Sequence, residues 1–277
     1  MGDFDASLIG SRHGGPVTSA EAAAIDAGLR SYMLRIYNYM DLGLDITAVA
    51  AFGIYALSVT DDATVAAHIV RGGTDAPARL AGDLYLTPLG YTVFVSPLKW
   101  VVIFAPLALV FALSFGIERL RPATAQVLFW IYAALIGLSL GSIFMVYTQT
   151  SVVRVFFITA ADFGALSLWG YTTQRDLTGM GLFLVMSLFG IIIAGVVNFW
   201  LASPALLWIV SIVGVLVFSG LTAWDTQRLK NEYIYGAMDG DTAERTAILG
   251  ALSLYLDFIN LFAMLLQLLG DQTTDDS

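Results

Sequence analysis

Near its C-terminus the chain reads Gly250-Ala-Leu-Ser-Leu-Tyr-Leu-Asp-Phe-Ile-Asn-Leu-Phe-Ala-Met-Leu-Leu266, an apolar run around one carboxyl, that of Asp257. A second aspartate lies in the apolar run Val215-Leu-Val-Phe-Ser-Gly-Leu-Thr-Ala-Trp-Asp225-Thr-Gln. Apolar runs of this kind are typical of helices that span a bilayer. A carboxylate buried in hydrocarbon costs several kcal/mol unless it is protonated, paired or in contact with water. Two of them on neighbouring helices therefore predict a site for protons or cations.

The composition indicates a membrane protein. Of the 277 residues, 58% are hydrophobic and 13% are charged, whereas a soluble domain carries about 25% charged residues. The chain has no cysteine, which excludes disulfides, iron–sulfur clusters and thiol catalysis. Its net charge of −9 gives no support to nucleic-acid binding, because that needs a basic patch. The first 30 residues have no apolar core, so we expect no cleavable signal peptide.

Seven apolar segments long enough to span a bilayer follow one another, separated by turns with glycine, proline or charged residues. The predicted fold is an all-α membrane protein, a bundle of seven transmembrane helices. Six spans with a re-entrant last segment are the alternative. The expected spans cover residues 32–59, 97–117, 123–147, 152–171, 179–199, a sixth from 204 onward, and 248–269.

The chain divides into three parts. Residues 1–30 form a polar N-terminal arm, residues 31–270 the transmembrane domain, and residues 271–277 an acidic tail. The one long connection, residues 60–96, joins the first two helices and is expected as an outer loop, in which Leu84-Tyr-Leu86 is a candidate for a short docked piece.

The basic residues predict the orientation. With the N-terminus in the cytoplasm, the inner side holds nine of the 13 Lys and Arg residues and the outer side holds four, which satisfies the positive-inside rule. We therefore expect a multi-pass membrane protein with a cytoplasmic N-terminus. The inner residues are Arg12, Arg30, Arg35, Arg119, Arg121, Arg175, Arg228, Lys230 and Arg245, and the outer ones are Arg71, Arg79, Lys99 and Arg154.

The two aspartates are expected at similar depth. If the sixth helix continues to Tyr235 and the seventh begins near Glu244, they lie ~15 and ~20 Å from the turn and face each other across a hairpin. Two facing carboxyls would share one proton and titrate as a coupled pair. Once deprotonated, Asp225 and Asp257 could bind Ca²⁺ transiently, because this ion prefers oxygen ligands. The alternative is that each aspartate only hydrogen-bonds a neighbouring helix.

Other polar residues lie inside the spans. Asp162 could line the same pathway, or its carboxyl could be bonded to a neighbouring helix. Asn260 lies near the face of Asp257 and could complete an oxygen cage, although an interhelical hydrogen bond is an equal alternative. Asp41 and Asp45 share one face of the first helix, which we expect to be its water-exposed start, with an inner vestibule as the alternative.

Two pairs of small residues predict close helix packing rather than chemistry. They are Gly137 with Gly141 and Ala160 with Gly164, each spaced by four residues. Small side chains at this spacing let the backbones of two membrane helices approach.

Several activities are excluded by the side chains that they need. A retinal protein requires a lysine in its last helix, and the only lysines are Lys99 and Lys230. Intramembrane zinc and serine proteases require histidine in the membrane, whereas His13 and His68 lie outside the spans. An intramembrane aspartyl protease is not excluded by its two aspartates, but its usual Tyr-Asp and Gly-x-Gly-Asp contexts are absent. We expect no enzyme and no cofactor.

Several stretches of the sequence resemble those of a known protein family. The last-helix run from Gly250 to Phe262, together with Trp224-Asp-Thr-Gln227, resembles the signature of the Bax inhibitor-1 (transmembrane Bax inhibitor motif) family, bacterial subtype. Further resemblance lies in Tyr37-Asn-Tyr-Met40, Gly141-Ser-Ile-Phe144 and Phe163-Gly-Ala-Leu-Ser-Leu-Trp-Gly-Tyr171. It covers roughly residues 30–58 and 97–270.

The resemblance implies a seven-helix bundle with the last helix central, in a bacterial inner membrane. It also implies a pH-sensitive calcium leak controlled by an aspartate dyad. The dyad would be Asp225 and Asp257. An arginine that the family uses as a latch matches Arg119, for which an ordinary basic flank is the alternative. A membrane-facing acid of the family's second helix is missing here, since its place falls near Ala108.

Two functions follow from these expectations. The first is a pH-sensitive leak for calcium or other cations, with protons and the lipid bilayer as its further partners. The second is a regulatory partner of membrane proteins, such as a membrane-bound ATP-dependent protease, which would use the arm of residues 1–30 as its handle.

Overall fold

The computed structural model describes residues 19–71, 74–81, 84–116, 120–235 and 240–273. Within these ranges seven helical spans are long and apolar enough to cross a membrane, which confirms the predicted fold class. The third span combines two helices, α5 and α6. The helices are α2 Ser19–Ser58, α4 Leu98–Gly116, α5 Pro122–Leu140, α6 Ile143–Val146, α7 Gln149–Thr172, α8 Thr178–Leu201, α9 Pro204–Tyr235 and α10 Gly240–Leu269.

Two of these helices are longer than the sequence predicted. Helix α2 begins at Ser19, so residues 19–30 of the expected arm continue the first membrane helix. Helix α10 begins at Gly240, eight residues before Ile248. At 1.5 Å per residue its 30 residues span ~45 Å, which is enough to cross a bilayer completely. The last segment is therefore a full span and does not re-enter.

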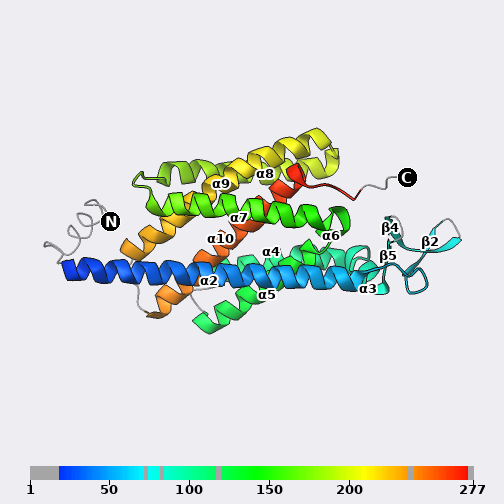
Figure 1. Ribbon diagram of the computed structural model, residues 1–277, viewed down its shortest axis with the longest axis horizontal. Coiled ribbons are helices and arrows are strands. Elements are labelled where there is room, and N and C mark those ends of the chain that lie inside the picture. The colour runs from blue at the N-terminus through cyan, green and yellow to red at the C-terminus, as the bar shows by residue number, and fades with distance from the viewer. Residues whose placement is uncertain (1–18, 72–73, 82–83, 117–119, 236–239, 274–277) are drawn as a thin grey trace.

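Helix α10 lies in the centre of the bundle (Figure 1). It packs against α2 and α5 on one side and against α7 and α9 on the other, while α4 packs on α5 and α8 packs on α9. Helix α2 begins at one end of the molecule, called here the N-terminal end, and α10 finishes at the opposite end. The central place of α10 explains its composition, because a helix surrounded by helices is apolar on all sides. Its buried residues include Ala247, Ile248, Leu252, Leu254, Tyr255, Phe258, Leu261 and Leu266.

The contact between α2 and α5 is the close one that small residues predicted. A Cβ atom placed on Gly137 would lie 2.5 Å from the carbonyl oxygen of Thr47 and 2.7 Å from the Cβ of Ala50. A Cβ on Gly141 would collide with Ile54. These distances leave no room for a side chain, so the two glycines bring α5 directly onto the backbone of α2.

The connection between α2 and α4 is folded rather than irregular. Strands β1, β5 and β4 form an antiparallel sheet, and β2 pairs with β3 as a hairpin. The segment expected as a docked piece, Leu84–Leu86, is strand β5, whose Leu86 is buried with Ala67 and Ala78. This end of the molecule is called the strand end (Figure 1). The elements are β1 Val59–Thr60, β2 His68–Arg71, β3 Thr74–Pro77, β4 Arg79–Ala81, β5 Leu84–Leu86 and helix α3 Pro88–Phe94.

Residues after α10 form hydrogen bonds and an ion pair with the start of α7 at the strand end. The backbone N–H of Thr148 donates to the carbonyl of Asp271 at 3.0 Å, and the N–H of Asp271 donates to Ser151 Oγ at 2.8 Å. Arg154 forms an ion pair of 2.9 Å with the Asp271 carboxylate. These bonds satisfy polar groups at the first turn of α7 that no helical partner reaches.

Candidate functional site

The structure brings Asp225 of α9 and Asp257 of α10 into contact. Their carboxyl groups lie close enough to interact with each other, and the two residues are only 6% and 5% exposed. Helix α9 runs from the strand end to the N-terminal end, and α10 runs back, so the two aspartates meet where the antiparallel helices cross. The expectation that they face each other across the last helix hairpin agrees with this geometry.

A hydrogen bond between two carboxyl groups requires a proton on one of them, because two carboxylates offer only acceptors. Arg228, one turn later on α9, influences which of the two carboxyls is ionised. Its Nη2 lies 2.8 Å from Asp225 Oδ1. A neighbouring cation favours the ionised form of a carboxyl. Arg228 therefore favours a carboxylate at Asp225, so a proton held by the pair would lie on Asp257.

One buried oxygen of the pair, Oδ2 of Asp257, has neither a hydrogen bond nor an ion pair among the described residues. Buried polar atoms normally have a partner, and an exception often marks a functional position. The free oxygen of Asp257 is thus an acceptor that a proton or a cation can use.

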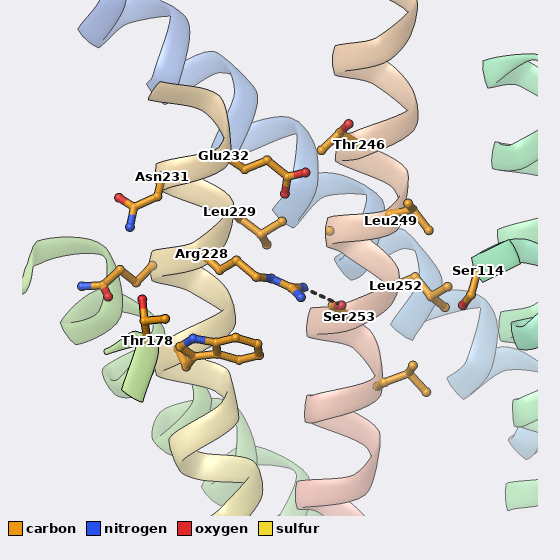
Figure 2. A pocket seen from close by; sticks show the side chains of 14 residues that line it. Ser114, Thr178, Arg228, Leu229, Asn231, Glu232, Thr246, Leu249, Leu252 and Ser253 are labelled. Atoms are coloured by element: carbon orange, nitrogen blue, oxygen red, sulfur yellow. Dashed lines mark hydrogen bonds between the residues drawn. The ribbon is translucent and has the colours of Figure 1, made fainter. Parts of the chain in front are cut away.

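Arg228 contacts Asp225 and also lines a neighbouring cavity. Its guanidinium lies 5.0 Å from the centre of the Trp224 ring and donates a hydrogen bond of 3.2 Å to Ser253 Oγ. Figure 2 shows the side chain reaching from α9 across to α10, with Ser114 and Thr178 on the flanking helices. Three contacts hold the arginine in place, although its side chain is 43% exposed.

The cavity itself measures about 700 Å³. It lies mainly between α9 and α10, and Ser114 of α4 and Thr178 of α8 line its sides (Figure 2). Leucines and polar side chains both line it, and Arg228 is the lining residue that contacts the carboxyl pair. The lining includes Gln227, Arg228, Asn231, Glu232, Thr246 and Ser253.

Beyond the pair, toward the strand end, large apolar side chains fill much of the space between α9 and α10. Phe218 and Leu221 precede Asp225 on α9, and Phe258 and Leu261 follow Asp257 on α10; all four are buried. A hydrated ion would have to lose its water among these side chains, which is costly in hydrocarbon-like surroundings. The carboxyl pair adjoins the cavity through the neighbouring residues Trp224 and Leu256 but is not part of its wall.

Two other residues that the sequence pointed to lie away from the pair. The Asp162 carboxylate accepts a hydrogen bond of 2.9 Å from Ser219 Oγ, and Ser219 is six residues, ~9 Å, before Asp225 on α9. Asn260 donates from its amide to the carbonyl of Leu256 within α10 at 2.8 Å. The structure therefore gives Asp162 an interhelical bond and Asn260 a local one.

Comparison with known proteins identifies the family. The family model described as inhibitor of apoptosis-promoting Bax1 matches residues 29–274. The chain belongs to the Bax inhibitor-1 family. It is 46% identical to the inner membrane protein YbhL of Escherichia coli K12 over 248 residues, which is 89% of this chain and 94% of YbhL. It is 45% identical to a Caulobacter vibrioides protein of uncharacterised function, covering 89% of this chain and 91% of that protein.

For this member of the Bax inhibitor-1 family, the arginine expected as a latch, Arg119, lies outside the described residues. The arginine that the structure does place against the pair is Arg228, which sequence reasoning had grouped with the basic flank. The signal was present, because residues three apart on a helix lie on the same side and Arg228 follows Asp225 by three.

The donor set limits what metal the pair could hold. The described residues contain no group of three or more His, Cys, Asp or Glu side chains in reach of one ion. Ca²⁺ takes six to eight oxygen ligands, and two carboxyls with Arg228 beside them fall far short of that number. The pair fits brief contact with a passing cation rather than a resident metal ion.

Proposed function

We propose that this protein is a pH-sensitive cation leak channel, with Ca²⁺ as its principal ion, and that Asp225 and Asp257 control it. The observation that carries the proposal is a pair of buried carboxyls on facing helices, beside an arginine that contacts one of them and lines the neighbouring cavity. Ionisable groups inside a membrane bundle are expensive and generally mark ion or proton pathways.

The proposed control uses the shared proton. When Asp257 is protonated, one negative charge remains on the pair and Arg228 balances it. Loss of the proton places two like charges on facing helices, and each disfavours the other. The pair then either separates, which moves α9 against α10, or attracts a cation. Both responses change the packing of α9 and α10 beside the cavity, so the conductance depends on pH.

Calcium is the proposed ion because both carboxyls of the pair are hard oxygen donors. A site with few ligands also suits conduction, which requires an ion to bind well enough to enter and weakly enough to leave. The proposal assigns no covalent chemistry to any residue.

We place the protein in a bacterial inner membrane with its N-terminus in the cytoplasm. The location is supported by the similarity to YbhL, which is named as an inner membrane protein. The orientation is supported by the excess of Lys and Arg at the N-terminal end. The strands would then lie outside.

The test is Ca²⁺ flux into proteoliposomes that contain an indicator dye, measured over a series of pH values. The wild type is expected to show a flux that changes with pH. Asp257→Asn replaces the shared proton by a neutral amide, so its flux should stay at one level at every pH. Asp225→Asn should lose the response as well.

Asp162→Asn is the matched control, because Asp162 is also an acid inside a span but bonds Ser219 rather than the pair. It should keep the pH response of the wild type. Unchanged flux and unchanged pH response in both Asp225→Asn and Asp257→Asn would overturn the role assigned to the pair.

A further inference from the structure

The polar side chains of α10 form a row along one face of the helix. Ser253, Asp257, Asn260 and Gln267 follow one another at intervals of four, three and seven residues, which is the spacing of a single helix face. Met264 lies on the same face, between Asn260 and Gln267. Ser253, Asn260 and Met264 are half-buried and Gln267 is exposed, although α10 is the central helix. Polar residues inside a membrane bundle are costly, and they generally mark a water-filled or ion-conducting path.

Helix α9 meets this row with contacts that follow it in order. Because α9 and α10 run in opposite directions, contacts at falling residue numbers on α9 match rising numbers on α10. The contact face is called here the seam, and it is ~21 Å long on α10. Its contacts join Arg228 to Ser253, Asp225 to Asp257, Gly214 to Met264, and Ser211 to Gln267.

The seam has oxygen ligands at both of its ends. At the carboxyl pair, Oδ2 of Asp257 is buried and has no hydrogen bond among the described residues. At the strand end the buried hydroxyl of Ser211 donates a hydrogen bond of 2.6 Å to Oε1 of Gln267. Between them, Asn260 bonds the Leu256 carbonyl through its Nδ2 and not through its carboxamide oxygen. Carboxamide oxygens, like carboxylates, are ligands that Ca²⁺ accepts.

One apolar side chain interrupts the row. From Asn260 to Gln267 the helix rises ~10 Å, and Met264 occupies this interval. A Cβ atom on Gly214 would lie 2.9 Å from Cγ and 3.0 Å from Sδ of Met264, so the methionine packs directly on the backbone of α9. Phe218, one turn farther on α9, is buried and apolar as well. A hydrophobic constriction holds back a hydrated ion, and an unbranched methionine can leave it by bond rotation.

We propose that the seam is the route of the ion from the carboxyl pair to the strand end. In this route Ser211 and Gln267 form a second cation-binding site, and Met264 on Gly214 is the gate between the two sites. The inference rests on the proposed channel function and adds the path that the ion takes. A shift of α9 against α10 changes the pair and the gate together, because both lie between the same two helices.

The first test uses the absence of cysteine from the chain, since every introduced thiol is then unique. Asn260→Cys, Gln267→Cys and Val213→Cys are reconstituted as full-length proteins into lipid vesicles. A charged methanethiosulfonate reagent is present on both sides, and mass spectrometry gives the reaction rates. Val213 is the matched control, because it is exposed and lies at the depth of Ser211 and Gly214 but outside the seam. Both seam thiols should react roughly ten-fold faster than Val213→Cys, because a thiol in apolar surroundings ionises poorly.

The second test removes the gate. Met264→Ser, added to Asn260→Cys, should raise the reaction rate of that thiol, and by itself it should raise Ca²⁺ flux in proteoliposomes, each by roughly three-fold or more. Met186→Ser is the matched control, since Met186 is an exposed methionine of α8 outside the seam. It should change neither quantity. Circular dichroism and gel filtration establish that the variants are folded.

The third test concerns the second site. Gln267→Leu removes the side-chain oxygen and should lower Ca²⁺ flux by roughly three-fold, whereas Gln267→Glu keeps an oxygen ligand and should conduct like the wild type. Equal flux in Gln267→Leu and the wild type would overturn this site.

The seam and its gate have their own contrary results. Rates for Asn260→Cys no higher than for Val213→Cys would overturn the seam as the route, and unchanged rate and flux with Met264→Ser would overturn the gate. The thiol rates do not depend on Ca²⁺ transport. A wild type without flux would therefore contradict the proposed channel, whereas slow labelling of Asn260→Cys contradicts the seam alone.

Discussion

At the scale of single residues, Arg228 decides how the charge on the carboxyl pair is distributed. It is the cation in contact with Asp225, and its side chain is partly exposed to the cavity. Removing it leaves the ionised form of the pair without its counter-charge, so the pair keeps its proton to higher pH. In Arg228→Gln the midpoint of the pH response of Ca²⁺ flux should rise, by about one pH unit or less because water screens part of the interaction.

Arg228→Lys is the control for this prediction. It keeps the positive charge but loses the planar group that stacks on Trp224 and bonds Ser253 at the same time. Its midpoint should lie between those of the wild type and Arg228→Gln. A midpoint that does not move in Arg228→Gln would show that the arginine does not influence the proton of the pair.

The sequence predicted the two aspartates because each stands out against an apolar context, and the structure places them together. It did not predict that Arg228 contacts the carboxyl pair. Arg228 lies among basic residues at a helix end, where the positive-inside rule alone explains it. The alternatives for Asp162 and Asn260 also stayed open, because a polar residue in a span does not say which neighbouring helix it faces.

At the scale of elements, the contact of α2 with α5 depends on glycines at positions where a side chain would not fit. Gly137→Ala would push its Cβ against the Thr47 carbonyl and Ala50, and it should lower the free energy of unfolding by about 1–3 kcal/mol. Gly190→Ala, at an open position of α8, should be neutral or stabilising by about 0.5–1 kcal/mol. Unfolding in detergent, followed by circular dichroism, measures both. An equal effect of the two substitutions would contradict the tight contact.

The turn between α8 and α9 contains a residue in a strained backbone conformation, which a substitution can test. Ala202 ends α8 with φ of 47°, the left-handed region, where a residue with a Cβ is strained. Ala202→Gly removes the clash and should raise the free energy of unfolding by about 0.5–1 kcal/mol. Ala205→Gly, inside α9, should instead lower it by a similar amount. The same unfolding experiment compares them, and destabilisation by Ala202→Gly would refute the strain.

Helix positions could be predicted from apolar runs, whereas two features of the elements could not. The extension of α2 back to Ser19 lies in a polar stretch that gives no hydropathy signal. The strands after α2 are two to four residues long, with glycine, proline and charged residues among them, so no alternating pattern marks them.

At the scale of the whole molecule, the odd number of spans puts the start of α2 and the end of α10 on opposite sides of the membrane. Fusion reporters test this together with the proposed orientation. Green fluorescent protein at the N-terminus should fluoresce, and alkaline phosphatase at the C-terminus should be active, because these reporters work only inside and outside respectively. Two reporters that work on the same side would contradict seven spans.

The surroundings of the two pairs of small residues could not be predicted from the sequence. Both pairs of small residues have the same spacing, yet Gly137 meets the backbone of α2 while Gly164 faces open space. Spacing shows which residues share a face of a helix, but not whether another helix covers that face. The central position of α10 was implied by the family resemblance, whereas its neighbours follow only from the three-dimensional packing.

The central claim is that the carboxyl pair holds one titratable proton, and infrared difference spectroscopy over a pH series tests it most directly. The C=O stretch of a protonated carboxyl is resolved from the bands of carboxylates. The account predicts one such band that disappears reversibly as the pH rises, is absent in Asp257→Asn and persists in Asp162→Asn. A band that remains unchanged in Asp257→Asn, or a wild type without any band that titrates, would contradict the account.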